Sequence, residues 1–301
     1  TLVNDAPIVV DDPSQPNLWR PHNDKFTFNG PTRLRDGLVH SLNLVSIRVL
    51  DDIGIDYAID FVSHFGFRKA NLPHALSLAL GSLSVSPMDL AAAYAVFANG
   101  GYKIEPYLID HITDSNGHVM LQAKASRLCN NCSDTDPSLI APRVIPADTA
   151  FLMDSALKGV IQHGTAVDAR SLNRKDIAGK TGTTNEQVDA WFAGYNPDLV
   201  VTTWIGYDTP HPLHEYAAKL ALPLWIDFMK TALHGKPERE IPQPANVISV
   251  RINPFNGLLA KSTQTNAINE YFRENDIPAV DEESTASASN IAGQESQDNL
   301  F

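Results

Sequence analysis

The sequence has few cysteines, few basic residues for its acidic content, and no long hydrophobic run. Its 23 Lys and Arg residues stand against 35 Asp and Glu residues, which gives a formal net charge of −12. So acidic a chain is a poor match for a nucleic-acid-binding protein or for a protein that binds membrane surfaces through basic residues. No apolar stretch approaches the roughly 18–20 residues that a membrane-spanning helix needs. We therefore expect no nucleic-acid partner.

The two cysteines, Cys129 and Cys132, form the pattern C-N-N-C. A structural zinc site needs about four ligands, and a redox C-x-x-C motif follows a strand and opens a helix. Here polar residues and a proline follow the pair, which is typical of a loop. The pattern favours a small surface disulfide or a free thiol pair over a redox or metal site. His211 and His214 have the spacing of two zinc ligands but no evident third, so we predict no metal and no cofactor.

The composition is that of an ordinary globular protein, with 301 residues of which 43% are hydrophobic. This length allows one large domain or two smaller ones with a sizeable core. The chain does not begin with methionine, and its first residues are typical of the middle of a domain. We therefore expect a fragment of a longer protein whose upstream part is missing.

Hydrophobic periodicity and capping patterns predict a mixture of helices and strands. Helices are expected over 33–40, with Thr32 as N-cap, then over 44–52 and 56–65. Further helices are expected over 88–98, preceded by Ser86 as N-cap and Pro87, over 148–162, with Asp148 as N-cap, and over 222–233. Strands are expected over 177–184, 190–194 and 200–206, as an antiparallel meander. The remainder is expected to be extended chain over 1–30, strand and turn over 102–118, a long loop or insertion over 122–142, and a C-terminal extension over 256–301 that ends in a disordered acidic tail over 281–301.

One short motif carries most of the chemical information. The run Gly179-Lys180-Thr181-Gly182-Thr183-Thr184 lies on a predicted strand that leads into a polar turn. Thr181 and Thr183 alternate with Gly182, so their hydroxyls share one face and, beside the ammonium of Lys180, could bind a carboxylate. Gly182 carries no side chain, so another backbone could approach and pair along the strand. K-T-G is the third sequence element of penicillin-recognising enzymes.

A second element of the same set lies upstream. Ser41-Leu42-Asn43 matches S-x-N and stands at a predicted helix end, where a loop could present both polar side chains. The tripeptide is weak evidence alone, because Ser171-Leu172-Asn173 repeats it just before the K-T-G strand.

Longer stretches give the chain a close resemblance to the transpeptidase domain of class A, bifunctional penicillin-binding proteins. Besides the two short motifs, they include Trp19-Arg20-Pro21-His22-Asn23, Leu80-Gly81-Ser82, Gly164-Thr165-Ala166, Asp189-Ala190-Trp191-Phe192-Ala193-Gly194-Tyr195 and Trp204-Ile205-Gly206-Tyr207-Asp208. The resemblance spans about residues 1–240. It implies an α/β, β-lactamase-like fold with an antiparallel sheet flanked by helices, a mostly helical lobe around 32–100, and a partial transpeptidase domain over 1–255.

The resemblance also implies site residues and partners. Ser41, Asn43 and Lys180 are the expected catalytic residues in a cleft between lobe and sheet. Thr181, Gly182, Thr183 and Thr184 are the expected substrate-binding residues. The implied ligands are peptidoglycan stem peptides ending in D-Ala-D-Ala and the β-lactams that mimic them. The implied parent is membrane-anchored, carries a glycosyltransferase domain, and works at the periplasmic face of the cytoplasmic membrane.

The nucleophile expected from the resemblance is not found where the family has it. Such enzymes need S-x-x-K upstream of S-x-N, and the sole match here is Ser155-Ala156-Leu157-Lys158. At 100° per residue, Ser155 and Lys158 fall on a helix half that we predict to be solvated, where a lysine keeps its proton. We therefore predict that the nucleophilic serine is absent from these residues and that they are inactive alone.

Two other functions stay open from the sequence. A hydrolase of the same superfamily, either a D,D-carboxypeptidase or a β-lactamase, would use the same motifs; Leu42 replaces the Asp of S-D-N and disfavours a class A β-lactamase. A non-catalytic binding module would keep the fold without the nucleophile. Trp191 and Trp204 are interpreted as packing against each other on adjacent strands.

Overall fold

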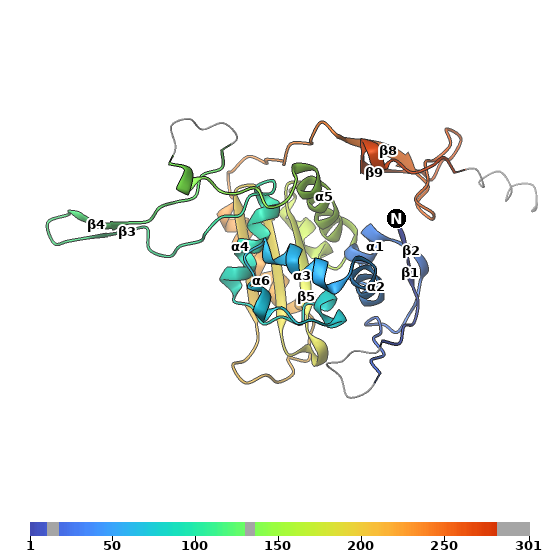
Figure 1. Cartoon of the computed structure of the whole chain (residues 1–301), viewed down its shortest axis with the longest axis horizontal. Helices are drawn as coiled ribbons and strands as arrows, with labels where there is room; N and C mark the ends of the chain where they lie inside the picture. Colours follow the sequence, from blue (N-terminus) through green and yellow to red (C-terminus); the bar gives the residue numbers. More distant parts are fainter. Residues whose placement is uncertain (11–17, 130–135, 282–301) are drawn as a thin grey trace, which may run out of the picture.

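The computed structural model describes residues 1–10, 18–129 and 136–281, and in these it is an α/β structure as predicted (Figure 1). The helices are α1 (Leu34–Val39), α2 (Asn43–Ile53), α3 (Ile55–Ser63), α4 (Pro87–Ala98), α5 (Ala147–His163) and α6 (Ala217–Ala232). The strands are β1 (Leu2–Asp5), β2 (Gly30–Arg33), β3 (His111–Thr113), β4 (Val119–Gln122), β5 (Ala178–Thr183), β6 (Ala190–Asn196), β7 (Leu199–Ile205), β8 (Val247–Ile252) and β9 (Ile268–Arg273).

The central sheet is the predicted antiparallel meander in the order β5-β6-β7. Strand β5, which carries K-T-G, is at its edge and pairs only with β6 among the described strands. Lys180 is opposite Ala193 and Gly182 is opposite Trp191. The other edge of β5, here called its open edge, thus has no strand partner among the described residues.

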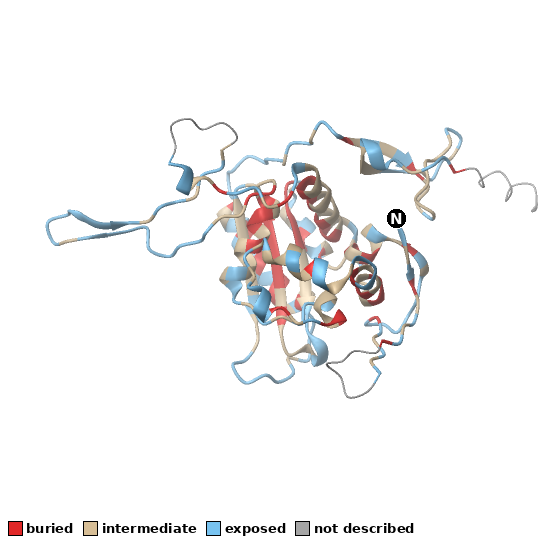
Figure 2. Ribbon diagram, viewed as in Figure 1, coloured by how far each residue is buried: buried red, intermediate tan, exposed pale blue. Residues whose placement is uncertain are grey.

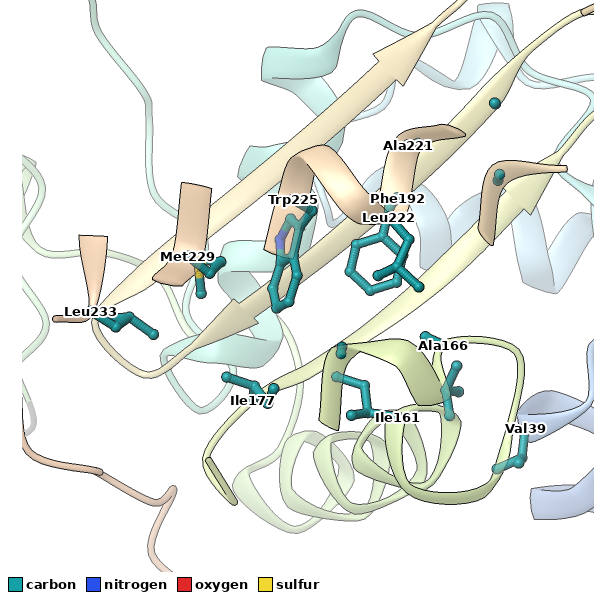
Figure 3. Close-up of a cluster of buried hydrophobic side chains, with 14 residues drawn as sticks. Val39, Ile161, Ala166, Ile177, Phe192, Ala221, Leu222, Trp225, Met229 and Leu233 are labelled. Carbon is teal, nitrogen blue, oxygen red and sulfur yellow. The ribbon is translucent and has the colours of Figure 1, made fainter. Parts of the chain in front are cut away.

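Three helices enclose the sheet. Helix α4 contacts β6 and β7, while α6 contacts all three strands. Helix α5 runs beside β5 and contributes Leu157 to the cluster that includes α4, and Val160 and Ile161 to the cluster that includes α6. Figure 2 shows the buried residues concentrated in this sheet and in α5. The largest cluster has Phe192 and Trp225 in edge-to-face contact, with ring centroids 4.9 Å apart (Figure 3).

The predicted helical lobe consists of α1 to α3 and the chain around them. Ile47, Leu50, Ala58 and Leu76 form its core together with Val10 from the N-terminal segment. Helix α4, predicted within the lobe, packs on the sheet instead. Its start is as expected: Ser86 Oγ accepts from the Asp89 N–H at 3.1 Å, and the Asp89 carboxylate accepts from the Ser86 N–H. This capping box satisfies backbone donors that the first helical turn leaves unpaired.

Two predicted helix caps are wrong. Thr32 lies in β2, and its hydroxyl donates to the Gly30 carbonyl rather than capping α1. Asp148 lies inside the first turn of α5, whose N-cap is Pro146. The Asp148 carboxylate accepts from Arg273 Nε at 2.9 Å and from Asn246 Nδ2 at 2.8 Å. Partners far along the chain therefore bind the Asp148 side chain, which the local sequence pattern predicts to be a helix cap.

Helix α6 begins at Ala217, five residues before the predicted start at 222. Pro223 is not at the start of the helix, where proline is favoured. Here it lies inside the helix, which continues since Ala217, Ala221, Leu222 and Trp225 are all buried on one side. Burial against the sheet outweighs the lost backbone hydrogen bond.

A hairpin of β8 and β9 was not predicted and crosses the predicted boundary between residues 255 and 256. It packs on α5, where Phe151 and Tyr271 are in edge-to-face contact at 5.1 Å. Glu270 of β9 accepts from both Nε and Nη2 of Arg35 in α1, at 2.7 and 2.5 Å. Apart from Asp281, the tail predicted over 281–301 lies outside the described residues.

This ion pair gives a stability prediction. Arg35 and Glu270 are 22% and 12% exposed, so replacing Glu270 by glutamine leaves a poorly hydrated guanidinium without its anion. We expect Glu270→Gln to lower the free energy of unfolding by about 2 kcal/mol, measured by urea denaturation. Asp60→Asn is the control. Asp60 forms an ion pair with Lys69, and the two side chains are 59% and 57% exposed, so this pair should contribute nothing measurable to the free energy of unfolding. Equal midpoints for the two variants would contradict this role for the hairpin.

A second hairpin, β3–β4, extends away from the body of the molecule (Figure 1), and every residue of its strands is exposed. Within the described residues, no helix combines the length and the apolar character needed to cross a bilayer. Cys129, at the base of the predicted loop 122–142, is disulfide-bonded, and Cys132 lies outside the described residues.

Candidate active site

The structure brings Ser41 and Lys180 together, although they are 139 residues apart in the chain. Lys180 Nζ donates to Ser41 Oγ at 2.9 Å and to the Thr181 carbonyl at 3.0 Å. Ser41 is exposed and has φ of 57°, a left-handed conformation that costs a non-glycine residue free energy. Backbone bonds keep it there: the Ser41 N–H donates to Leu38 and the Leu42 N–H to Gly37. The strained turn presents the hydroxyl to the ammonium.

Burial lowers the pKa of Lys180 to about 8, because the site desolvates its charged form. At neutral pH the ammonium is still the main form, so it can polarise the Ser41 hydroxyl. Its pKa is nonetheless close enough to neutrality for proton exchange to be easy. The pair is therefore suited to proton relay at a reacting centre.

Asn43 is the first residue of α2, beside the pair. Its Nδ2 donates to the His22 carbonyl at 3.0 Å. The neighbouring Asn23 is buried and accepts from the Leu44 N–H while donating to Asp5 at 2.7 Å. The Trp-Arg-Pro-His-Asn segment thus fixes the N-terminus of α2, and with it Asn43.

The open edge of β5 offers backbone groups as well as side chains. Thr184 donates its N–H to Asp189 across the ladder. Because bonded and non-bonded pairs alternate in an antiparallel ladder, the N–H groups of Thr183 and Thr181 point to the open edge. Side chains also alternate, so Lys180 projects from one face of β5 and the two threonines project from the other. The ammonium and the hydroxyls reach this edge from opposite faces.

Each threonine hydroxyl has a partner in the structure. Thr183 Oγ1 accepts from the Ala217 N–H at 3.1 Å, and Thr184 Oγ1 accepts from the Asp189 N–H at 2.9 Å. Thr181 Oγ1 is 2.6 Å from Thr165 Oγ1. A hydroxyl that accepts from an N–H keeps its own proton free to donate. Gly182 is opposite Trp191, whose Cβ would be 3.4 Å from an added Cβ.

Trp191 and Trp204 pack against each other as expected, with ring centroids 5.8 Å apart. They do so at the surface, since Trp204 is 38% exposed and its Nε1 donates to Asp189 at 2.8 Å. Trp191 shares the sheet face of Lys180, because Ala193, opposite Lys180, is two residues further along β6. The pair therefore borders the site.

The expectation that Ser155 and Lys158 lie on a solvated face of α5 is wrong. Asp154 on that side is 2% exposed, accepts from the Tyr195 hydroxyl at 3.1 Å, and pairs with Lys158 at 3.1 Å. Burial raises the pKa of the Asp154 carboxyl. The Ser155 hydroxyl accepts from Arg35 at 3.1 Å. Ser155 and Lys158 thus each have another partner, which argues against a nucleophile–base pair.

The pair His211 and His214 lies in the loop before α6. The His211 ring stacks on Tyr207 with centroids 3.6 Å apart, and its Nδ1 contacts the Thr209 carbonyl at 2.9 Å. No group of three or more potential metal ligands occurs among residues 1–10, 18–129 and 136–281.

Thr165 is a residue of the site to which no sequence motif gave a role: its Oγ1 contacts Thr181 of the K-T-G strand, and its N–H donates to the Val39 carbonyl, two residues before Ser41. A signal was present in the run Gly164-Thr165-Ala166 at the end of a predicted helix. This run indicates only a family resemblance, because nothing in the local sequence shows that Thr181 lies against Thr165.

Comparison with known proteins gives consistent results. Residues 2–230 match the family model described as the penicillin binding protein transpeptidase domain. Penicillin-binding protein 1A of Pseudomonas aeruginosa is 40% identical over 316 residues, which covers 92% of this chain and 38% of the relative. This chain thus spans well under half of that relative's length.

Solved structures show the same fold. The crystal structure of penicillin-binding protein 1A from Haemophilus influenzae has a TM-score of 0.83 and 37% identity, covering 92% of this chain and 45% of that one. PonA1 of Mycobacterium tuberculosis, solved in complex with penicillin V, has a TM-score of 0.64 and 22% identity, covering 86% of this chain and 68% of that one.

Proposed function

The chain belongs to the penicillin-binding protein transpeptidase family, and from this premise we propose that it forms part of a serine D,D-transpeptidase. The proposed reaction cross-links peptidoglycan stem peptides through an acyl-enzyme, and β-lactams acylate the same serine. The hydrogen bond from Lys180 to Ser41 carries this proposal, because it joins the second and third family motifs at the open edge of β5.

In the proposed mechanism a serine of an S-x-x-K segment gives its proton to the lysine of that segment and attacks the penultimate D-Ala carbonyl. The C–N bond to the terminal D-Ala breaks, and Ser41, polarised by Lys180, passes a proton to the leaving nitrogen. An amine of a second stem peptide then attacks the acyl-enzyme, the ester C–O bond breaks, and the proton that the amine loses returns to the serine oxygen. Asn43 binds the backbone amide of the substrate.

We assign the binding of the substrate's terminal carboxylate and of the oxyanion to residues of β5. Thr181 and Thr183 donate their hydroxyl protons to the terminal carboxylate, and the Thr183 N–H forms half of the oxyanion hole. That N–H faces the open edge, which supports the assignment. Gly182 admits the substrate backbone alongside the strand. Thr184 was predicted to bind substrate; its bond from the Asp189 N–H supports a role in shaping the turn after β5.

We propose that the nucleophile lies outside the 301 residues. The sole S-x-x-K here has Arg35 and Asp154 as partners, and the chain spans 38% of the P. aeruginosa relative. We further propose that the parent carries a glycosyltransferase domain and a membrane anchor and works at the periplasmic face of the cytoplasmic membrane. The disulfide at Cys129 supports an oxidising compartment.

The test is acylation of the full-length protein by a fluorescent penicillin. We expect Ser41→Ala to lower the second-order acylation rate by about 10²-fold, since the proton relay is lost. Ser171→Ala is the matched control, because it changes the other Ser-Leu-Asn copy, whose hydroxyl donates to the Asp168 carbonyl. An unlabelled wild type would favour a binding module, and release of D-Ala without transfer to an added amine would favour a hydrolase.

A further inference from the structure

Thr165 lies where the end of α1, the end of α5 and the K-T-G strand meet. Its backbone N–H donates to the Val39 carbonyl at 3.3 Å, two residues before Ser41. Its Oγ1 is 2.6 Å from Thr181 Oγ1. One residue therefore contacts the K-T-G strand and the segment that leads into Ser41.

The backbone around Thr165 is fixed by close packing. A Cβ at Gly164 would lie 2.2 Å from the Val39 carbonyl oxygen, so the two segments approach as closely as glycine allows. On the other side Ala166 is fully buried, and its N–H donates to Val160 at 3.2 Å. The Thr165 hydroxyl is thus delivered to Thr181 by a rigid backbone.

The neighbouring threonine shows what this contact can do. Thr183 Oγ1 accepts from the Ala217 N–H, a group that can only donate, so the Thr183 proton remains free for a ligand. The contact between Thr165 and Thr181 allows either hydroxyl to be the donor. If Thr165 donates, Thr181 is left in the same state as Thr183, with both protons available to one carboxylate.

Building on the proposed function, we propose that Thr165 is a positioning residue for carboxylate recognition. Its hydroxyl donates to Thr181 Oγ1 and so directs the Thr181 proton to the carboxylate of the substrate or β-lactam. The chain of two hydroxyls ending on an anion is stronger than either bond alone, because each polarises the next. Thr165 itself does not touch the ligand.

The experiment measures acylation of the full-length protein by benzylpenicillin and by its methyl ester, which lacks the carboxylate charge. We expect Thr165→Val to slow acylation by the acid about 10-fold, because a hydrogen bond to a charged group is weakened, and to slow acylation by the ester less than about 2-fold. Thr165→Ser should restore the wild-type ratio of acid to ester. Thr203→Val is the matched control, since its hydroxyl donates to Ala221 away from this edge.

A double-mutant cycle separates positioning from structural support. In a Thr181→Val background, Thr165→Val should have no further effect on the acid. Equal slowing of acid and ester by Thr165→Val, or an additive effect in the cycle, would overturn the positioning role. If neither probe acylates the wild type, the proposed function itself fails. If the wild type reacts and Thr165→Val reacts at the same rate, only the positioning role of Thr165 fails.

Discussion

Replacing Lys180 by methionine should lower penicillin acylation of the full-length protein by about 10³-fold. Methionine keeps the length and apolar body of the side chain but removes the ammonium that donates to Ser41 Oγ at 2.9 Å. Both the polarisation of Ser41 and the positive charge near the developing negative charge are lost. Ser41 is exposed, so water can replace the missing donor and the fold needs no rearrangement.

The same substitution should not reduce stability. Burial lowers the pKa of Lys180 to about 8 from its ordinary 10.5, so the charged form is less favourable in the folded chain. Below pH 8 Lys180 is protonated in both the folded and the unfolded chain, so the free-energy cost of burying its charge is fully present. Between pH 8 and 10.5 the unfolded chain binds more protons, so the wild type gains stability as pH rises.

The difference between wild type and Lys180→Met isolates this group from other titrations. We expect the methionine variant to be at least as stable as the wild type at pH 7. The difference in free energy of unfolding between variant and wild type should decrease by up to a few kcal/mol between pH 8 and 10.5. Urea denaturation at several pH values measures it. A variant that is less stable at pH 7, or that retains more than a tenth of wild-type acylation, would show that Lys180 serves the fold rather than the chemistry.

The largest effect on stability is expected at Trp225. This side chain is fully buried in the main cluster between α6 and the sheet, against Phe192 (Figure 3). Trp225→Ala should lower the free energy of unfolding by about 4 kcal/mol, since it removes apolar contacts and leaves a cavity under the K-T-G sheet. Thermal and urea unfolding of the chain measure the loss.

Trp225→Phe is the matched variant. Trp225 Nε1 is buried with no hydrogen-bond partner among the described residues, so phenylalanine removes an unsatisfied donor along with part of the ring. We expect a loss below about 1.5 kcal/mol. If Trp225→Phe lowered the free energy of unfolding as much as Trp225→Ala, the indole N–H would have to make a stabilising hydrogen bond. The apolar cluster would then not be the main source of the stability that Trp225 provides.

Local patterns in the sequence predicted the elements whose cause is local. The N-cap at Ser86 and the short turn that joins β6 to β7 in the meander depend on neighbours in the chain, and both are where they were expected. The cap predicted at Thr32 failed because that residue lies in β2, paired with Val3 of β1, and the cap at Asp148 failed because the distant Arg273 binds its carboxylate. The β8–β9 hairpin was missed because its anchors, Arg35 and Phe151, are more than a hundred residues away.

The sequence named the candidate site residues but not their geometry. The motifs named Ser41 and Lys180, and the structure joins them by one hydrogen bond. Strand alternation predicts that Thr181 projects away from Lys180, but no pattern could show that Thr165 lies against it, because that depends on where α5 ends. The solvated face predicted for Ser155 was also wrong because of tertiary packing, since Tyr195 binds Asp154 on that face and Arg35 binds Ser155.

The most direct test is intact-mass spectrometry with peptide mapping after exposure to benzylpenicillin, performed on the 301-residue chain and on the full-length protein. The central claim is that these residues supply the partners Ser41 and Lys180 to a nucleophile elsewhere. It predicts no adduct on the chain alone and one adduct on the full-length protein, at a serine outside residues 1–301. An adduct at Ser155, or at any serine within the chain, would contradict it.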